Sequence, residues 1–431
     1  MNQTDISALY QKYLLYPSVQ TDTRQITKGS LFFALKGPNF NGNQFAQKAL
    51  ESGAAFVIAD EDAGFTDERI IYTNHVLTTL QALALHHRQQ LKIPIIAITG
   101  SNGKTTTKEL VNAVLATQYK TSTTIGNLNN HIGVPLTLLK IKQTHEIAVV
   151  EMGANHQKEI EGYCTYTLPS HGIITNCGKA HLEGFGGVEG VRKGKGELFD
   201  FLRLHGGTVF AYDDYDYLHQ MTMDIQHIEW YGTQKGKVMG NILQSEPFLT
   251  VQLNQGIGFE KLQTQLVGGY NLPNVLCAIA IGKHFGVSDE KIKQAIENYS
   301  PDNSRSQLIS KGSNKIVLDA YNANPTSMQA AIENFAKLPA QNKILLLGGM
   351  MELGEDSIRE HQELIHLLQQ YKWADVYLVG GDFVHTQHGY HYIEKSNDLA
   401  VILSQKNISN TFFLIKGSRS MQMEKVLEGI V

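Results

Sequence analysis

The clearest chemistry in this chain lies in residues 99–107, where two glycines, a lysine and several threonines follow an apolar run at Ile95–Ile98. Glycines allow backbone N–H groups to turn around phosphate oxygens, and the positive N-terminal end of a following helix adds to their effect. In such a loop Lys104 reaches the β and γ phosphates, and the Thr105 hydroxyl binds Mg²⁺. Only residues 101 and 102 separate the two glycines, so the spacer is shorter than in the general pattern. Because a strand precedes the segment and a helix follows it, we favour an ATP phosphate site over a chance turn. The expected contacts are Gly100, Asn102, Gly103, Lys104, Thr105 and Thr106.

Two further apolar runs also end in polar residues. Ile147–Val150 leads into Glu151, and Gly172–Thr175 leads to a segment that contains His181. The carboxyl ends of buried parallel strands meet at one edge of a sheet, which is where ligands bind in such folds. We therefore expect Glu151 to lie beside the phosphate loop as a Mg²⁺ ligand, since hard cations prefer oxygen. The alternative is a solvated charge at the end of a strand.

Other polar residues are ambiguous when they are considered alone. His181 could be a buried structural histidine, and Lys195 could be a solvated charge on a helix. The segment Gly126–Pro135 contains three asparagines that could bind a polar substrate or form a plain turn. Asn271 and Asn274 lie where a helix should begin, so they could be helix caps.

The elements that would position these residues form three α/β units. Residues 1–80 contain apolar strands at 31–35 and 54–59 with a helix over 45–52, and a helix over 78–90 leads to the next unit. The central unit, residues 81–305, alternates strand and helix around the phosphate loop, but short alternating runs between Thr208 and Leu266 predict an antiparallel annex. Residues 306–431 predict a Rossmann-like, doubly wound sheet. Its strands are expected at 315–318, 343–347, 376–379 and 412–415, with a helix over 358–370.

Composition is consistent with this organisation and excludes some functions. A chain of 431 residues should hold roughly three domains, and 42% hydrophobic with 18% charged residues is ordinary for a globular protein. The net charge of −4 gives no sign of a nucleic-acid partner. No run approaches the roughly 18 apolar residues of a membrane span, and no signal peptide is evident. Three scattered cysteines predict free thiols in the cytoplasm.

Taken together, these motifs resemble the Mur ligases, the ATP-dependent amide-forming enzymes of peptidoglycan synthesis. Within that family the likeness is to the MurF type, which joins D-Ala-D-Ala to UDP-MurNAc-tripeptide, and it extends over essentially the whole chain. The boxes that carry it are 99–107, 126–135, 151–154, 181–186, 195–197, 319–325, 352–354 and 416–419.

The resemblance implies an acyl phosphate mechanism, in which ATP activates the terminal carboxylate of the tripeptide and the amine of D-Ala-D-Ala then attacks it. It implies that Lys104, His181 and Lys195 are catalytic. Thr105 and Glu151 would hold a first Mg²⁺, and His181 and Lys195 would support a second. Lys195 matches a lysine that carries a carbamate in the family, although Lys193 lies only two residues away.

The resemblance also distributes the substrates along the chain. The first unit would bind the UDP end, with Arg24 and Lys36 near the diphosphate, Asn41 at the uracil, and Thr23 as a further substrate-binding residue. The other implied contacts are Asn271 and Asn274 with adenine, Arg305 with phosphate, Asp319 with the nucleotide after closure, Asn127 and Asn130 with the substrate, and Asn322, Asn324, Lys416, Ser418 and Arg419 with D-Ala-D-Ala.

Two alternatives remain beside this interpretation. One is a sister ligase that adds diaminopimelate or lysine, which the box Asn322–Pro325 argues against because those relatives differ there. The other is a non-catalytic paralogue that binds a nucleotide sugar, against which the intact Lys104, Glu151 and Lys195 speak. We expect a monomer, and the pattern does not distinguish a tripeptide that ends in diaminopimelate from one that ends in lysine.

Overall fold

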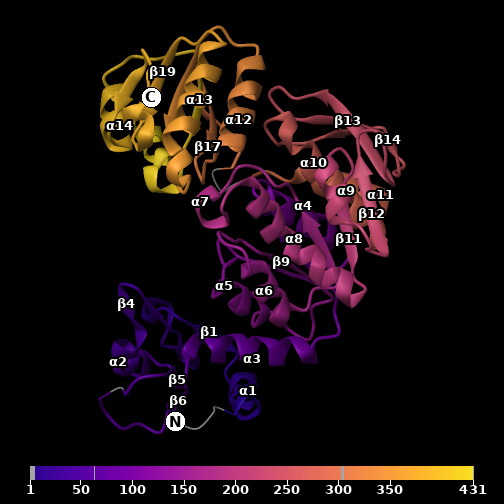
Figure 1. The fold of residues 1–431 in the computed structure, drawn as a ribbon, viewed down its shortest axis with the longest axis vertical. Coiled ribbons are helices and arrows are strands. Elements are labelled where there is room, and N and C mark those ends of the chain that lie inside the picture. The colour runs from indigo at the N-terminus through magenta and orange to yellow at the C-terminus, as the bar shows by residue number, and fades with distance from the viewer. Residues whose placement is uncertain (1–4, 63, 302–304, 431) are drawn as a thin grey trace. The chain divides into compact units, whose positions relative to one another are not determined.

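The computed structural model describes residues 5–62, 64–301 and 305–430 (Figure 1). These residues form two compact units, which we describe separately. The first unit comprises 1–97, 119–153 and 159–171, and the second comprises 98–118, 154–158 and 172–431. Helices alternate with mostly parallel strands throughout the described chain, so the predicted α/β fold class is confirmed.

The N-terminal module is a four-stranded parallel sheet in the order β1-β2-β5-β6. Phe32 and Val57 on its central strands pack with Ala49 of the covering helix, and all three are buried. The apolar runs predicted as strands at 31–35 and 54–59 are confirmed, with ends shifted by one or two residues. The elements are α1 (Ile6–Leu15), β1 (Ser18–Gln20), β2 (Ser30–Phe33), β3 (Lys36–Gly37), β4 (Phe40–Asn41), α2 (Ala46–Glu51), β5 (Phe56–Ala59), β6 (Ile70–Tyr72) and α3 (Val76–Gln90).

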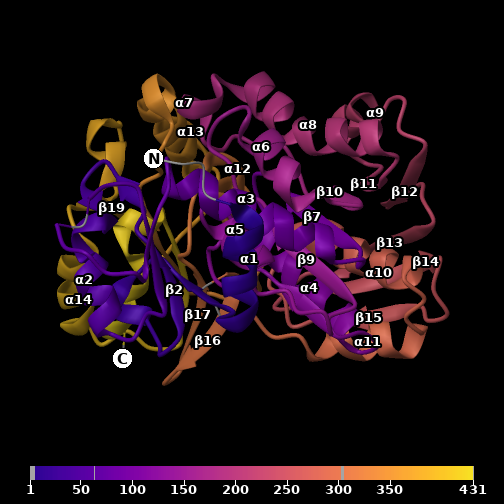
Figure 2. The ribbon, with the colours of Figure 1, turned by 90° about the horizontal axis from the view of Figure 1, so that it is seen from below.

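The central sheet has nine strands in the order β15-β14-β13-β12-β11-β10-β7-β9-β8, and β10 to β14 can be followed one after another in Figure 2. Its strands are β7 (Ile95–Thr99), β8 (Thr121–Thr123), β9 (Ile147–Glu151), β10 (His171–Ile174), β11 (Thr208–Tyr212), β12 (His227–Gly232), β13 (Val238–Gln244), β14 (Thr250–Gln255) and β15 (Lys261–Gln263). The helices are α4 (Lys104–Ala116), α5 (Gly133–Leu138), α6 (Glu159–Thr167), α7 (Leu182–Phe185), α8 (Val188–His205), α9 (Asp216–Met221), α10 (Leu272–His284) and α11 (Asp289–Asn298).

The predicted antiparallel annex between Thr208 and Leu266 is wrong for its first half. Strand β11 pairs in parallel with β12, and β12 pairs in parallel with β13. Antiparallel pairing begins only at β13–β14 and continues to β15. Helix α9 lies between β11 and β12 and provides the crossover that these two parallel neighbours need. Strands β12 and β13 pair over only two positions, Tyr231 with Val238 and Gly232 with Met239. Most of β12 is only partly buried, so its sequence looks like that of a strand with one face in water.

The C-terminal sheet has six strands in the order β16-β17-β21-β18-β19-β20, and only the edge pair β16–β17 is antiparallel. Helix α12 contacts α13, whereas α14 contacts the 3₁₀ segment Met423–Gly429 (Figure 1). The four strands predicted for this region are confirmed. The elements are β16 (Gln307–Lys311), β17 (Asn314–Asp319), α12 (Pro325–Lys337), β18 (Lys343–Gly348), α13 (Ser357–Gln369), β19 (Asp375–Val379), β20 (His391–Ile393), α14 (Ser396–Ser404) and β21 (Phe412–Lys416).

All three cysteines lie among the described residues, are buried, and form no disulfide. Burial raises the pKa of Cys177 and of Cys277 to about 12. Within the described ranges, none of the helices is long and apolar enough to cross a membrane.

Candidate active site

The phosphate loop runs from the end of β7 to the start of α4, as the sequence predicts. Gly100 and Gly103 both have positive φ, +144° and +79°. A Cβ on Gly100 would lie 2.0 Å from Oγ1 of Thr175, and a Cβ on Gly103 would lie 2.7 Å from Oδ1 of Asn274. Both positions therefore require glycine, because the backbone conformation and the close neighbours exclude a side chain.

The end of β10 holds this loop in place. The Thr175 hydroxyl donates to the carbonyl of Asn102 at 2.6 Å, and the Asn102 N–H donates to Oδ1 of Asn176 at 3.1 Å. The Ser101 N–H donates to the carbonyl of Asn176 at 2.9 Å. The loop is thus preorganised by the neighbouring strand, which reduces the ordering cost of binding a ligand.

Lys104 is the first residue of α4, and its side chain folds back over the loop. Its Nζ donates to the carbonyl oxygens of Gly100 at 2.6 Å and Ser101 at 3.3 Å. The ammonium group therefore lies over the backbone that would surround a phosphate. The next residue, Thr105, is buried in the first turn of the helix.

Asn271 and Asn274 are buried beside the phosphate loop. Nδ2 of Asn274 donates to Oδ1 of Asn271 at 3.0 Å, and its own Oδ1 accepts from the Thr107 hydroxyl of α4 at 3.1 Å. Asn271 also donates to the carbonyl of Val267 at 3.0 Å. Asn271 occupies the N-cap position of α10 but its side chain makes no capping hydrogen bond, and Asn274 lies within the first turn of the helix. They connect α10 to the phosphate-loop helix.

Glu151 belongs to the first of the two compact units, where it is the last residue of β9 and only 1% exposed. Its Oε1 accepts from Nδ2 of Asn129 at 2.8 Å, and its backbone N–H donates to the Thr124 hydroxyl at 2.9 Å. Sequence reasoning selected Asn127 and Asn130 from this box and missed Asn129. Three asparagines in four positions look alike in sequence, and only the fold identifies the one that meets the carboxylate.

The other two asparagines of this box have different surroundings. Oδ1 of Asn130 accepts from the N–H groups of Ile132 and Gly133, at 3.1 and 2.9 Å, and so stabilises the entry to α5. The carbonyl of Asn127 accepts from the Asn129 N–H at 2.8 Å. Both residues therefore shape the turn that presents Asn129.

The segment after β10 meets the C-terminal module within the second unit. The imidazole Nδ1 of His181 contacts the carboxylate of Glu352, and both residues have positive φ, at 53° and 63°. The hydrogen bond with His181 lowers the pKa of Glu352. Lys179 pairs with Glu360 at 2.7 Å. Left-handed backbone at non-glycine residues costs free energy and is concentrated at functional sites.

Lys195 lies on α8 and is 1% exposed, whereas Lys193 on the same helix is exposed. Nζ of Lys195 donates to the carbonyl of Ala154 at 3.1 Å and lies 4.9 Å from the centre of the Phe185 ring. Burying a lysine side chain costs free energy, because the ammonium group loses its hydration. The alternative of a solvated helix charge is therefore wrong for Lys195.

Several predicted residues gather at the carboxyl ends of β17 and β21. Lys416 is buried, and its Nζ pairs with Asp319 at 2.6 Å and donates to the carbonyl of Asn322 at 3.2 Å. The Ser418 hydroxyl donates to the carbonyl of Ala323 at 3.3 Å. This edge of the sheet thus holds a buried ion pair beside the box 319–325.

Asn324 connects this edge to the phosphate loop. Its Nδ2 donates to Oδ1 of Asn102 at 2.7 Å, and its Oδ1 accepts from the Ser327 N–H at 2.9 Å as part of a capping box at the start of α12. One side chain therefore both caps a helix of the C-terminal module and contacts the nucleotide loop.

Two of the predicted arginines flank one tyrosine. The guanidinium of Arg305 lies 3.7 Å, and that of Arg419 5.1 Å, from the centre of the Tyr321 ring. Cations over an aromatic face are stabilised by the ring quadrupole. Arg305, which is predicted to bind a phosphate, and Arg419, which is predicted to bind D-Ala-D-Ala, therefore contact the same ring.

His361 of α13 supports the loop that carries Glu352. It is fully buried, its Nδ1 donates to the carbonyl of Ser357 at 2.7 Å, and its Nε2 accepts from the Met350 N–H at 3.0 Å. Burial is the largest cause that lowers the pKa of His361. This arrangement requires the neutral ring, because protonation of Nε2 would break the bond to Met350.

We predict that this histidine contributes to acid sensitivity. Its pKa is lower folded than unfolded, so the unfolded chain binds the proton first and stability falls as pH drops below about 6.5. As the pH decreases, the free energy of unfolding of His361→Gln should therefore fall less steeply than that of the wild type, by up to about 1.4 kcal/mol per pH unit. Urea titrations between pH 5 and 8 would measure this, with exposed His366→Gln on the same helix as control. An unchanged slope in His361→Gln would contradict the assignment.

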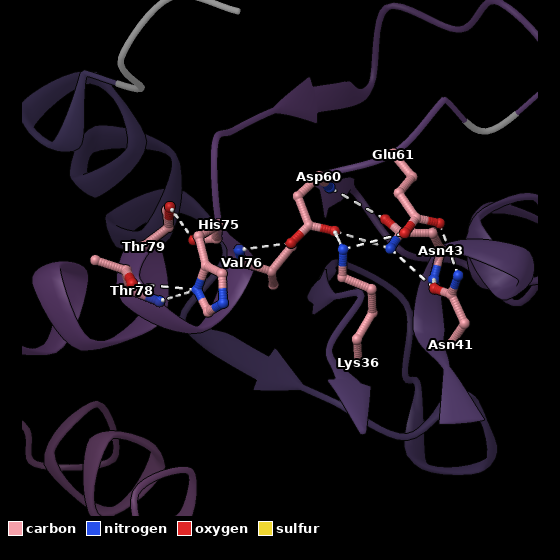
Figure 3. Close-up of polar contacts among 9 residues, drawn as sticks. All are labelled: Lys36, Asn41, Asn43, Asp60, Glu61, His75, Val76, Thr78 and Thr79. Carbon is pink, nitrogen blue, oxygen red and sulfur yellow. Dashed lines mark hydrogen bonds and ion pairs between the residues drawn. The ribbon is translucent and has the colours of Figure 1, made fainter. Parts of the chain in front are cut away.

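In the N-terminal module, two predicted cations pair with carboxylates. Arg24, in the 3₁₀ turn that starts at Thr23, pairs with Asp22 at 2.6 Å and is largely exposed. Lys36 pairs with Asp60 and Glu61, each at 3.1 Å. Asn41 lies opposite Lys36 in the β3–β4 hairpin. Figure 3 shows Lys36 and Asn41 directed toward the same two-carboxylate segment after β5.

Comparison with known proteins identifies the family of the chain. Three family models match, described as Mur ligase family, catalytic domain (residues 16–99), Mur ligase middle domain (98–282) and Mur ligase, glutamate ligase domain (304–418). UDP-N-acetylmuramoyl-tripeptide–D-alanyl-D-alanine ligase of Bacillus subtilis is 34% identical, with coverage of 98% of this chain and 94% of the relative. The Escherichia coli protein of the same name is 33% identical, with coverage of 96% and 93%.

Solved structures give the same result. MurF ligase from Thermotoga maritima, in complex with ADP, matches with a TM-score of 0.87 and 25% identity, and the match covers 96% of this chain and 97% of that one. The family models, the full-length relatives and the fold agree over the three modules. The chain therefore belongs to the Mur ligase family.

Proposed function

We propose that this protein uses ATP to join D-Ala-D-Ala to UDP-MurNAc-tripeptide in peptidoglycan precursor synthesis. The observation that carries the proposal is the contact between Asn102 of the phosphate loop and Asn324 of the C-terminal module. Asn324 belongs to the box that resembles the D-Ala-D-Ala-adding type, and this contact with the phosphate loop supports the proposal. The two full-length relatives bear this activity in their names, and the Thermotoga maritima structure holds ADP.

The chemistry follows from the weakness of a carboxylate as an electrophile. An oxygen of the tripeptide carboxylate attacks the γ phosphorus, the bond to the β-phosphate oxygen breaks, and ADP leaves. The amine of D-Ala-D-Ala then attacks the acyl carbon, loses a proton, and inorganic phosphate departs. In this sequence Lys104 neutralises and aligns the transferring phosphoryl group. The backbone N–H groups of the loop between Gly100 and Lys104 bind the phosphates.

The donor chemistry of the predicted metal ligands fits Mg²⁺. Thr105 and Glu151 supply the oxygen donors that this ion prefers, and both are buried. We propose that they hold one Mg²⁺, and that His181 with Lys195 supports a second, with a carbamate on Lys195. When bound, such ions offset the negative charge of the phosphates. Asn271 and Asn274 are proposed at the adenine side and Arg305 at a phosphate.

We further propose the division into UDP-, ATP- and D-Ala-D-Ala-binding domains at residues 1–80, 81–305 and 306–431. The substrates would arrive on separate domains, and closure would exclude water from the acyl phosphate. The reaction is proposed to take place in the cytoplasm. We propose that the enzyme acts as a monomer.

A substrate panel scored by phosphate release tests this function. Tripeptides ending in diaminopimelate or lysine are combined with D-Ala-D-Ala, and UDP-MurNAc-dipeptide is combined with diaminopimelate as the rival reaction. We expect phosphate release to depend on both the tripeptide and D-Ala-D-Ala. Faster turnover of the dipeptide with diaminopimelate would support the sister ligase instead. ATP binding without phosphate release in any combination would support the non-catalytic alternative.

A further inference from the structure

A cavity of about 350 Å³ lies in the C-terminal module, at the carboxyl ends of β19 and β20, and we call it the β19–β20 cavity. Strand β19 pairs in parallel with β20, and the next helix is α14, which lies with β19 in this module (Figure 1). Ligands of parallel sheets bind at this edge, outside the carboxyl ends of the strands. The lining does not include the residues predicted for D-Ala-D-Ala, which are Asn322, Asn324, Lys416, Ser418 and Arg419.

Three segments of the chain meet around this cavity at a glycine. Gly380, which directly follows β19, has a φ of +60°, and its N–H donates to the carbonyl of Ile393 at 2.9 Å. A Cβ on Gly380 would lie 2.9 Å from Sδ of Met421 and 3.1 Å from the carbonyl oxygen of Glu394. Glycine therefore allows the turn and the close approach that bring the ends of β19 and β20 against the 3₁₀ turn Arg419–Met421.

The N-terminal end of α14 forms another part of the lining, through Ser396 and Asn397. The residue at the N-cap position is Lys395, and its side chain makes no capping hydrogen bond, because a lysine has no acceptor atom. The first N–H groups of a helix have no partner within the helix and carry a partial positive charge. This end of α14 therefore offers hydrogen-bond donors and a positive potential to a ligand in the cavity.

A buried hydroxyl lines the same space. Ser396 belongs to the cavity lining but is only 6% exposed. Within the described part of the chain, its hydroxyl has no hydrogen-bond partner. Buried polar side chains in proteins are nearly always hydrogen-bonded. This hydroxyl therefore points, independently of the helix end, to an acceptor that a ligand supplies from the cavity.

Two lysines give the lining a positive charge. Lys395 precedes α14, and Lys425 belongs to the 3₁₀ segment Met423–Gly429, which packs against α14. Among the described residues, neither ammonium group is paired with a carboxylate. Glu394 is the acidic residue of the lining, so two cations stand against one anion. A surface with this balance attracts an anionic ligand.

A phosphoryl group matches this set of donors best. It carries about two negative charges at pH 7 and three acceptor oxygens, so it can accept from N–H groups and a hydroxyl at the same time. Helix N-termini are common phosphate sites, and lysines bind phosphate as point charges. A cavity of this volume is at the lower end of the range for small-molecule sites, so it also admits a small organic group attached to the phosphate.

We propose that the β19–β20 cavity binds a small phosphorylated ligand, with its phosphoryl group at the N-terminal end of α14. The Ser396 hydroxyl and the first N–H groups of α14 donate to the phosphoryl oxygens, and Lys395 and Lys425 offset the charge. The same chemistry would serve inorganic phosphate and a phosphate monoester, and the experiment distinguishes the two.

The test follows methionine methyl signals of the whole protein by NMR at constant ionic strength while inorganic phosphate, glycerol 3-phosphate or acetate is added. A non-hydrolysable ATP analogue is present at saturation, so that the phosphate loop is already occupied. Met421 lines the cavity, and Met421→Leu assigns its signal. We expect this signal to shift saturably with at least one of the two phosphates and little with acetate. Tighter binding of glycerol 3-phosphate would identify a monoester as the ligand, and tighter binding of inorganic phosphate would identify the free ion.

Variants connect the shift to the proposed donors. Ser396→Ala should raise the Kd about tenfold, the size of a hydrogen bond to a charged group. Lys395→Ala and Lys425→Ala should each weaken binding to a similar extent. Lys372→Ala removes an exposed lysine just before β19, at the opposite edge of the same sheet, and should bind as wild type does. The dispersion of the methionine signals shows whether each variant is folded.

Three results would overturn the inference. They are the lack of a saturable Met421 shift with either phosphate, binding of acetate as tight as that of the phosphates, or an unchanged Kd in both Ser396→Ala and Lys395→Ala. None of them bears on the proposed function, because substrate-dependent phosphate release relies on residues outside this cavity.

Discussion

Replacing Lys104 with alanine is expected to reduce kcat for phosphate release by about 10³-fold, comparable to the loss of a main transition-state donor. In the structure its Nζ donates to the carbonyl oxygens of Gly100 and Ser101. ATP would replace those carbonyls with phosphate oxygens, whose charge grows as the phosphoryl group transfers. Phosphate release at saturating ATP, tripeptide substrate and D-Ala-D-Ala measures the effect.

The controls for this prediction separate charge from position. Lys104→Arg keeps the positive charge. We expect it also to lose most activity, because a planar guanidinium does not fit the position that the compact ammonium group occupies beside the loop carbonyls. Lys140→Ala removes an exposed lysine elsewhere in the central domain and should turn over as wild type does. Turnover of Lys104→Ala within a few-fold of wild type would remove this residue from the mechanism.

Lys195→Ala is expected to lower turnover by about 100-fold, the upper range for groups that support a metal ligand set. If the amine carries a carbamate, a short carboxylate such as formate should restore part of the rate, because it returns an anion to the vacated space. A purely structural loss would not respond in this way, since added carboxylate cannot rebuild packing against Phe185.

Lys193→Ala is the matched control for this substitution, because Lys193 lies on the same helix but is exposed. It should leave the rate unchanged with or without carboxylate. Thermal unfolding of both variants would show whether Lys195→Ala remains folded. Wild-type rates in folded Lys195→Ala would refute the assignment, and a loss confined to Lys193→Ala would move it to that residue.

Sequence reasoning located the strands and the phosphate loop because their signals are local. Apolar runs such as Ile95–Ile98 can hardly be anything but buried strands, and glycines before a helix mark the loop. The failure at β11 and β12 has a different origin. Whether neighbouring strands run in parallel depends on the crossover between them, and the six residues of α9 gave too short a periodic signal.

The site was predicted less completely, for a related reason. Lys195 lies on the buried side of α8 and Lys193 on the exposed side. Their positions in the sequence alone do not show which of the two is buried. Asn129 was missed because its role depends on Glu151, which is 22 positions away in sequence. The contact between Asn324 and Asn102 joins residues 222 positions apart. Such pairings arise from the closed fold and leave no local pattern.

The buried cysteines have a practical consequence for studying how the enzyme moves. Cys177 and Cys277, with pKa values near 12, are thiolate in only about one molecule in 10⁵ at pH 7, and labelling reagents react with the thiolate. Cys164 is shielded by complete burial. Cysteines introduced at exposed positions would therefore be labelled with little reaction at the native cysteines. Paired fluorophores or spin labels on the N-terminal and C-terminal modules could then report their separation during turnover without a cysteine-free variant.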